Sequence, residues 1–102
     1  MNTYCIATIV NHEEITSGIW KMELEASEIA QTARPGQFIQ LYPWDERNML
    51  ARPISLSSIS EKSVTIVYRV VGKGTRQLSK LQNNDRIRVM GPLGNGFALP
   101  DK

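Results

Sequence analysis

The sequence predicts one all-β domain, a six-stranded antiparallel Greek-key β-barrel with a single short helix. Three observations indicate this fold. Most segments are short and rich in β-branched, aromatic and other apolar residues. Glycine, proline and polar turn signals separate these segments at short intervals. The chain of 102 residues has room for one hydrophobic core and no more. Short strands with turns at this spacing are typical of a closed or nearly closed barrel.

Two strands are expected in the first quarter of the chain. The first is Tyr4–Val10, which is apolar and rich in β-forming residues, and the polar run at 11–14 is expected to end it. The second is Ile19–Glu25, where apolar and charged residues alternate with the period of a half-buried strand. Its inward face would carry three large apolar side chains: Trp20, Met22 and Leu24.

Two further strands follow a turn signal at Arg34–Gly36. The third strand is predicted at Gln37–Tyr42, directly after that turn. The mixed polar segment Pro43–Ala51 is expected to be a loop. The fourth strand is predicted at Pro53–Ile59, where apolar residues and serines alternate, and residues 60–63 have the composition of a hairpin turn.

The strongest strand signal is Val64–Val71, which is dense in valine, isoleucine and tyrosine. The glycine-rich segment 72–74 is expected to stop this strand. Thr75 is then expected to be the N-cap of a short helix over Arg76–Leu81, with two leucines facing inward.

The C-terminal part is expected to hold one more strand, Ile87–Met90, closed by a glycine-rich loop at 91–97. Residues 1–98 would then form the barrel, and residues 99–102 the start of a linker to a further domain.

The composition is ordinary for a globular protein, with 41% hydrophobic and 22% charged residues and a net charge of +2. The single cysteine, Cys5, excludes an internal disulfide and a four-cysteine metal or iron–sulfur site. His12, the only histidine, lies in the polar run, so neither a metal site nor a catalytic residue is predicted. Without a signal-peptide pattern or a long apolar run, the sequence favours the cytoplasm.

Two segments have residue types that suit a cofactor with a phosphate and a ring. In Arg52–Ser55, a guanidinium that matches phosphate oxygens lies beside a rigid proline, and a hydroxyl able to bond a ring heteroatom follows. In Gly72–Thr75, two glycines let backbone N–H groups approach an anion, although the motif is too short for a Walker loop or a dinucleotide fingerprint. Taken separately, each is explained better as structure: a surface arginine before an edge-strand proline, and a flexible turn.

Two more segments have open interpretations. Tyr68 in Val67–Arg69 could stack on a ring or form a hydrogen bond, and Arg69 could pair with a phosphate. They could equally be a core-facing aromatic residue and a solvated charge. The loop at 91–97 is most simply a structural turn.

These four segments occur in an order and at a spacing that resemble the FAD-binding domain of the ferredoxin–NADP reductase superfamily. Within it, the chain most resembles the electron transfer subunit of bacterial class 1B dihydroorotate dehydrogenase, because the forms of Arg52–Ser55 and of residues 91–97 are typical of that subunit. The resemblance covers essentially the whole chain. It implies that Arg52 lies near the FAD pyrophosphate and Ser55 near the flavin ring. The cofactor-binding residues that it implies are Arg52, Pro53, Ile54, Ser55, Val67, Tyr68, Arg69, Gly74 and Thr75.

The resemblance also implies a role and partners. In that family, a nicotinamide-binding domain and a cysteine-rich segment that ligates a [2Fe–2S] cluster follow the barrel, and neither NAD nor the cluster has a site in this chain. The expected function is an FAD-binding electron-transfer module of pyrimidine biosynthesis. It would pass electrons to NAD from dihydroorotate, which a separate catalytic subunit of a hetero-oligomer oxidises. The chain would be inactive alone, and no nucleic acid or membrane partner is expected.

Two alternatives remain. The chain could be the FAD domain of another ferredoxin- or flavodoxin-linked reductase. It could also be a small β-barrel that binds nucleic acid or protein, although such a module needs exposed aromatic residues among clustered basic ones, and here lysine and arginine are scattered.

Overall fold

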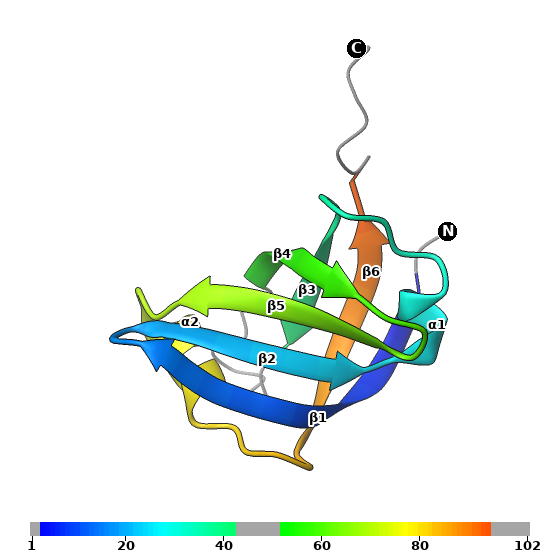
Figure 1. Cartoon of the computed structure of the whole chain (residues 1–102). Coiled ribbons are helices and arrows are strands. Elements are labelled where there is room, and N and C mark those ends of the chain that lie inside the picture. The colour runs from blue at the N-terminus through cyan, green and yellow to red at the C-terminus, as the bar shows by residue number, and fades with distance from the viewer. Residues whose placement is uncertain (1–2, 43–51, 95–102) are drawn as a thin grey trace.

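The computed structural model describes residues 3–42 and 52–94. Six antiparallel strands close into a barrel in the order β1-β2-β5-β4-β3-β6, and Figure 1 shows this barrel with one helix near each end. The elements are β1 (Thr3–Thr16), β2 (Ile19–Glu25), α1 (Ser27–Ala30), β3 (Phe38–Tyr42), β4 (Arg52–Ile59), β5 (Ser63–Arg69), α2 (Lys73–Ser79) and β6 (Arg86–Leu93). The loop expected at Pro43–Ala51 and the domain end and linker expected at 98–102 lie outside the described residues.

The connections confirm the predicted Greek-key barrel. Strands β3, β4 and β5 are sequential neighbours, whereas β6 returns across the barrel and pairs with both β1 and β3. The bounds of β2 are as predicted, and those of β3, β4 and β5 differ from the predicted ones by one or two residues. The four-residue helix α1 is an addition that the sequence did not indicate.

Strand β1 continues through the polar run at 11–14, so the prediction that it ends at Val10 is wrong. Its pairing with β2 shifts register between Ile9 and Asn11 and again between Glu14 and Thr16. Each shift is a β-bulge, which adds a residue and changes the face to which the following side chains point. The alternation in the sequence therefore breaks, although the strand does not.

Strand β6 also extends further than predicted, through Gly91 and Pro92 to Leu93, where a closing loop was expected. Gly91 and Pro92 are buried. A Cβ atom at Gly91 would lie 2.9 Å from Cγ2 of Ile39 on β3. Glycine at this position therefore marks a close strand contact rather than a turn.

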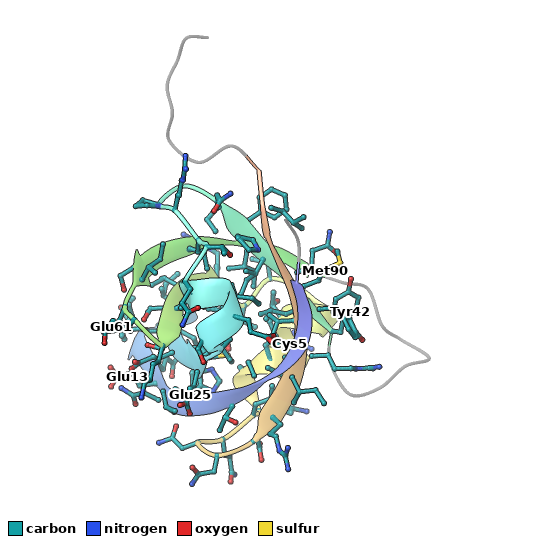
Figure 2. The ribbon with its side chains drawn as sticks, turned by 90° about the vertical axis from the view of Figure 1, so that its right-hand side faces the viewer. Cys5, Glu13, Glu25, Tyr42, Glu61 and Met90 are labelled. Atoms are coloured by element: carbon teal, nitrogen blue, oxygen red, sulfur yellow. The ribbon has the colours of Figure 1, made fainter. Side chains whose placement is uncertain are left out.

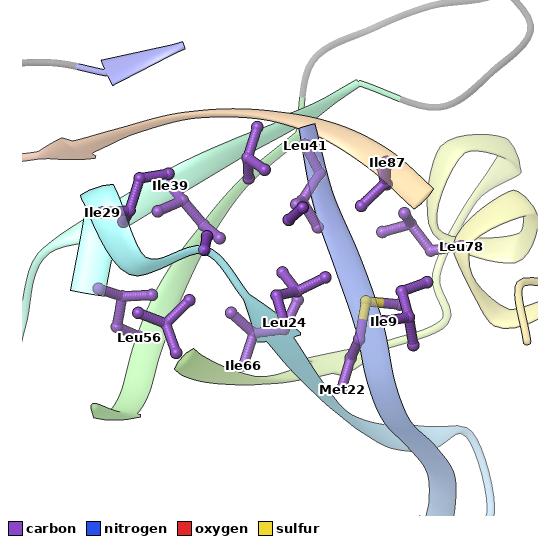
Figure 3. Packing of buried hydrophobic residues seen from close by; sticks show 14 of the residues in the cluster. Ile9, Met22, Leu24, Ile29, Ile39, Leu41, Leu56, Ile66, Leu78 and Ile87 are labelled. Atoms are coloured by element: carbon purple, nitrogen blue, oxygen red, sulfur yellow. The ribbon is translucent and has the colours of Figure 1, made fainter. Parts of the chain in front are cut away.

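The core is mostly aliphatic and fills the barrel from end to end (Figure 3). Met22 and Leu24 are fully buried, as the alternation predicted, and Trp20 on the same face is half-buried. Helix α1 lies across one end of the ring of strands (Figure 2) and contributes the buried Ile29. Helix α2 contributes the buried Leu78 near the other end (Figure 3). The two helices thus cover the barrel ends and leave the outer faces of the strands for other contacts.

No helix in the described parts of the chain has the length and apolar character needed to cross a membrane.

Candidate functional site

A groove of about 330 Å³ lies where β4, β5 and the start of α2 meet. Three stretches that are far apart in the sequence line it, and they are three of the segments singled out above. The lining residues are Ile54, Ser55, Val67, Tyr68, Arg69, Val71 and Thr75. The structure therefore brings six of the implied cofactor-binding residues together in one depression.

Strand β4 contributes one wall of the groove. Leu56 points into the core and pairs with Ile66 of β5, so the preceding residue, Ser55, faces outward and is exposed. Ile54 is half-buried beside it. The backbone of Arg52 and Pro53 belongs to the same strand, but their side chains lie outside the described part of the structure.

Strand β5 and the residues after it contribute the second wall. Val67 and Arg69 face outward, between inward-facing residues of the same strand. The side chain of Val67 is 40% exposed and that of Val71 is 64% exposed. This wall therefore combines two uncovered apolar side chains with one guanidinium.

The start of α2 closes one end of the groove, and here the predicted N-cap is wrong. The helix begins at Lys73, which places Gly72 at the N-cap and Thr75 at the third helical position. The Thr75 Oγ1 atom accepts hydrogen bonds from the backbone N–H groups of Val71 (2.9 Å) and Gly72 (3.1 Å). This is the backward half of a capping box. Thr75 is only 5% exposed, so it holds the turn in shape.

The remaining implied residue, Gly74, is in the first turn of α2. The backbone of this turn lies directly beside Thr75 and so at the same end of the groove. Of the loop expected at 91–97, none of the described residues lines the groove; residues 91–93 belong to β6, and residues 95–97 lie outside the described chain.

Tyr68 is placed as the structural alternative had it, with its side chain turned into the barrel and 5% exposed. Its hydroxyl is 2.8 Å from Nε2 of His12. Burial raises the pKa of Tyr68 far above its ordinary value, so the hydroxyl stays protonated. Burial also lowers the pKa of His12, against a smaller opposing effect of its hydrogen bond to the Leu81 carbonyl.

Sequence reasoning placed His12 in a polar turn, and this was wrong. His12 is half-buried in the middle of β1, and its ring lies 4.8 Å from that of Trp20 between centroids. Only a polar run with an isolated histidine was visible in the sequence. A β-bulge leaves no reliable pattern in one sequence, so the strand could not be traced through it.

The chemistry of the groove suits an anionic ligand with a flat apolar part. Among the described lining residues, Arg69 carries a positive charge and none carries a negative one. Ser55 adds a hydroxyl, and the exposed valines offer apolar surface. In the described parts of the chain, no cluster of three or more histidine, cysteine or acidic residues could hold a metal ion.

No model of a protein family matches the chain. The dihydroorotate dehydrogenase B (NAD(+)), electron transfer subunit of Clostridium acetobutylicum is 39% identical over 94 residues, which are 92% of this chain and 37% of that protein. The subunit of the same name from Streptococcus pneumoniae strain R6 is 43% identical over 95 residues, 91% of this chain and 37% of that protein. The chain thus spans little more than a third of the length of the curated relatives it matches.

Solved structures share the fold. The structure of an NADH-dependent reduced ferredoxin-NADP oxidoreductase, described for flavin-based electron bifurcation, matches with a TM-score of 0.85 and 27% identity, covering 92% of this chain and 34% of that one. The ferredoxin-NADP+ reductase from Plasmodium falciparum matches with a TM-score of 0.74 and 18% identity, covering 94% and 40%. The second match, at its low identity, shows the fold alone.

The chain therefore has the barrel fold of the FAD-binding domains of ferredoxin reductases, and over about a third of their length it is similar in sequence to dihydroorotate dehydrogenase B electron transfer subunits.

Proposed function

We propose that the chain binds FAD in the groove between β4, β5 and α2. The observation that carries this proposal is the convergence of three separate stretches, Ile54–Ser55, Val67–Arg69 and Thr75, on one depression. These are residues that the family resemblance implies from the sequence alone. An accidental resemblance in sequence gives no reason for them to meet.

The residues present fit a flavin dinucleotide. Val67 and Val71 provide exposed apolar surface on which an aromatic ring can lie. Ser55 offers a hydroxyl to ring heteroatoms. Arg69 and the backbone of the first turn of α2 offer charge and donors to a pyrophosphate. Arg52 and Pro53, at the start of β4, are proposed to complete this set, with Arg52 near the pyrophosphate.

Bound FAD would supply one- and two-electron redox chemistry, while the protein supplies position and electrostatics. The groove is open on one side, so a neighbouring protein or domain could approach the flavin ring. In this scheme Thr75 contributes by fixing the turn, because its hydroxyl is already bonded to the N–H groups of Val71 and Gly72.

We further propose that the chain acts within an electron-transfer system like that named for its curated relatives. Electrons from dihydroorotate, oxidised on a catalytic partner subunit in the cytoplasm, would reach FAD here and continue to NAD. A [2Fe–2S] cluster would need a site outside this chain, because a four-cysteine cluster cannot be built from one cysteine. NAD is proposed to bind outside this chain as well.

One observation favours a second candidate. The match to the NADH-dependent reduced ferredoxin-NADP oxidoreductase has the higher TM-score of the two structures described above and 27% identity. The same FAD module could therefore serve a reductase with ferredoxin as its redox partner. Reduction of the flavin-loaded protein by a dihydroorotate-oxidising subunit, tested against reduction by ferredoxin, distinguishes the two.

The first prediction concerns FAD binding itself. Purified protein titrated with FAD should show a perturbed flavin absorption spectrum and quenched flavin fluorescence. Arg69→Ala should weaken binding roughly tenfold, since a charge-assisted hydrogen bond to phosphate contributes about 1.5–3 kcal/mol. Lys62→Ala, which removes a positive charge from the exposed turn between β4 and β5, should bind like wild type.

Two results would contradict the proposal. Absence of any spectral change in folded wild-type protein would remove FAD as the ligand. Equal effects of Arg69→Ala and Lys62→Ala would move the site away from the groove. Salt-sensitive binding of single-stranded DNA without a response to FAD would instead support a nucleic-acid module.

A further inference from the structure

A part-buried polar network centred on His12 is not used by the proposed site. The His12 Nδ1 atom is 2.8 Å from the carbonyl oxygen of Leu81, and Nε2 is 2.8 Å from the hydroxyl of Tyr68. The histidine thus joins three parts of the chain: β1, β5 and the segment that follows α2. Both bonds span long stretches of sequence, and neither is needed to pair the strands.

The bulge in β1 is what turns this histidine inward. Ile9 pairs with Leu24 and Asn11 with Glu23, so Val10 is the extra residue of the bulge. After the shift His12 pairs with the buried Met22. Without the extra residue, the inward position would fall on Asn11.

The hydrogen bonds determine the tautomer. A carbonyl oxygen only accepts hydrogen bonds, so Nδ1 of His12 must carry a proton and donate to the carbonyl oxygen of Leu81. In a neutral imidazole the other nitrogen is then an acceptor, and the Tyr68 hydroxyl donates to it. His12 therefore acts as a neutral bridge with one donor and one acceptor, both in use.

This bridge lies directly behind the groove. Tyr68 is one of the groove residues, and its neighbours Val67 and Arg69 form the β5 wall. Leu81 follows α2, the helix that holds Thr75 at the other end of the groove. The backbone N–H of Leu81 also bonds to the carbonyl of Leu78, which is fully buried. Holding Tyr68 and Leu81 together consequently holds the β5 wall against the α2 end.

We propose that His12 is a positioning residue of the FAD groove, which fixes β5 relative to α2 through its bonds to Tyr68 and Leu81. The inference rests on the proposed function, since it assumes that FAD occupies this groove. Small displacements between the two walls would misplace the donors for the pyrophosphate relative to the apolar surface for the ring.

Substitutions can separate the hydrogen bonds from the bulk of the side chain. His12→Phe keeps an aromatic ring beside Trp20 but removes both bonds. His12→Gln supplies an amide with one acceptor and two donors on a side chain of similar reach. Tyr68→Phe removes only the hydroxyl. Ile29→Val, in α1 at the opposite end of the barrel, is a control that destabilises the core without touching the groove.

The experiment measures FAD affinity and urea unfolding for each variant. His12→Phe and Tyr68→Phe should each weaken FAD binding about three- to tenfold. Because loss of the bond between His12 and Tyr68 already uncouples Tyr68 from Leu81, the double variant should lose little more than either single variant. His12→Gln should stay within about twofold of wild type. Ile29→Val should unfold at lower urea yet bind FAD normally.

Each other result overturns something definite. Wild type that does not bind FAD removes the proposed function and this inference with it. Wild type that binds while His12→Phe and Tyr68→Phe bind equally well overturns the inference alone. Equal losses of FAD affinity in His12→Phe and His12→Gln would show that the hydrogen bonds of His12 do not position the groove. Weaker FAD binding by Ile29→Val would show that FAD affinity only follows the stability of the fold. If His12→Phe does not fold, Tyr68→Phe still decides the matter.

Discussion

At the scale of single residues, Thr75 and His12 show how polar side chains hold the walls of the groove in place. The hydroxyl of Thr75 bonds to the backbone of the turn: it donates to the Gly72 carbonyl and accepts from two N–H groups. Both ring nitrogens of His12 form hydrogen bonds, one with Leu81 and one with Tyr68. Buried polar groups must find partners, and here the partners connect the elements that form the groove.

The buried histidine predicts a pH dependence of stability. The pKa of His12 in the folded protein is lowered from 6.5 by burial, so the unfolded chain binds more protons in the range between the lowered value and 6.5. The free energy of unfolding contributed by His12 should therefore be complete above pH 6.5 and should fall as the pH drops below it.

The measurement is the urea midpoint of wild type and His12→Phe from pH 7.5 to 5. The difference between the two curves should shrink as the pH falls, because the variant lacks this titration while the carboxylates titrate in both. Parallel curves would show that His12 is not held neutral by its surroundings.

At the scale of elements, the strands with simple alternation were predictable and the irregular ones were not. Strand β2 has the bounds that its alternation indicates. The predicted end of β1 is too early because the β-bulges shift the alternation of its side chains. The predicted end of β6 is too early because glycine and proline at 91–92 have the composition of a turn. In each case a tertiary pairing, which no local pattern records, keeps the chain extended.

Gly91 provides a test of the close contact between β6 and β3. Gly91→Ala should lower the unfolding free energy by roughly 1–3 kcal/mol, because the new methyl group meets Cγ2 of Ile39 at 2.9 Å and the backbone carbonyl of Phe38 at 3.3 Å. Gly72→Ala is the control, since a Cβ atom there meets nothing within 4 Å and its cost is limited to the preference for glycine over alanine at the N-cap of α2. Denaturant unfolding measures both, and equal costs would mean that β6 and β3 can move apart.

At the scale of the whole molecule, the barrel is closed, and helices with fully buried residues cover both ends (Figure 1). The core thus does not depend on a ligand to exclude water. The groove lies outside this core, on the strand surface. FAD should therefore add stability to a fold that already exists, rather than be required to form it.

This gives a prediction on thermal stability. FAD at a hundred times its Kd should stabilise the protein by about 2.7 kcal/mol, which for a domain of this size raises the Tm by roughly 10 °C or more. Differential scanning fluorimetry with FAD, FMN and riboflavin measures it. Equal shifts with all three would assign no part of the binding to the pyrophosphate and adenosine half. A cooperative transition that FAD leaves unmoved would contradict the proposed site.

The sequence by itself determined the class of fold, because alternation and turn residues are local properties of the chain. Arg52–Ser55, Val67–Arg69 and Gly72–Thr75 were named as cofactor-binding segments through their order and spacing, which resemble those of a known family. Only the tertiary structure decided that Ile54, Ser55, Val67, Tyr68, Arg69 and Thr75 share one groove, that Thr75 caps the turn from inside the helix, and that His12 lies behind it. Those facts depend on bulges, strand order and contacts between residues distant in sequence, which local pattern cannot encode.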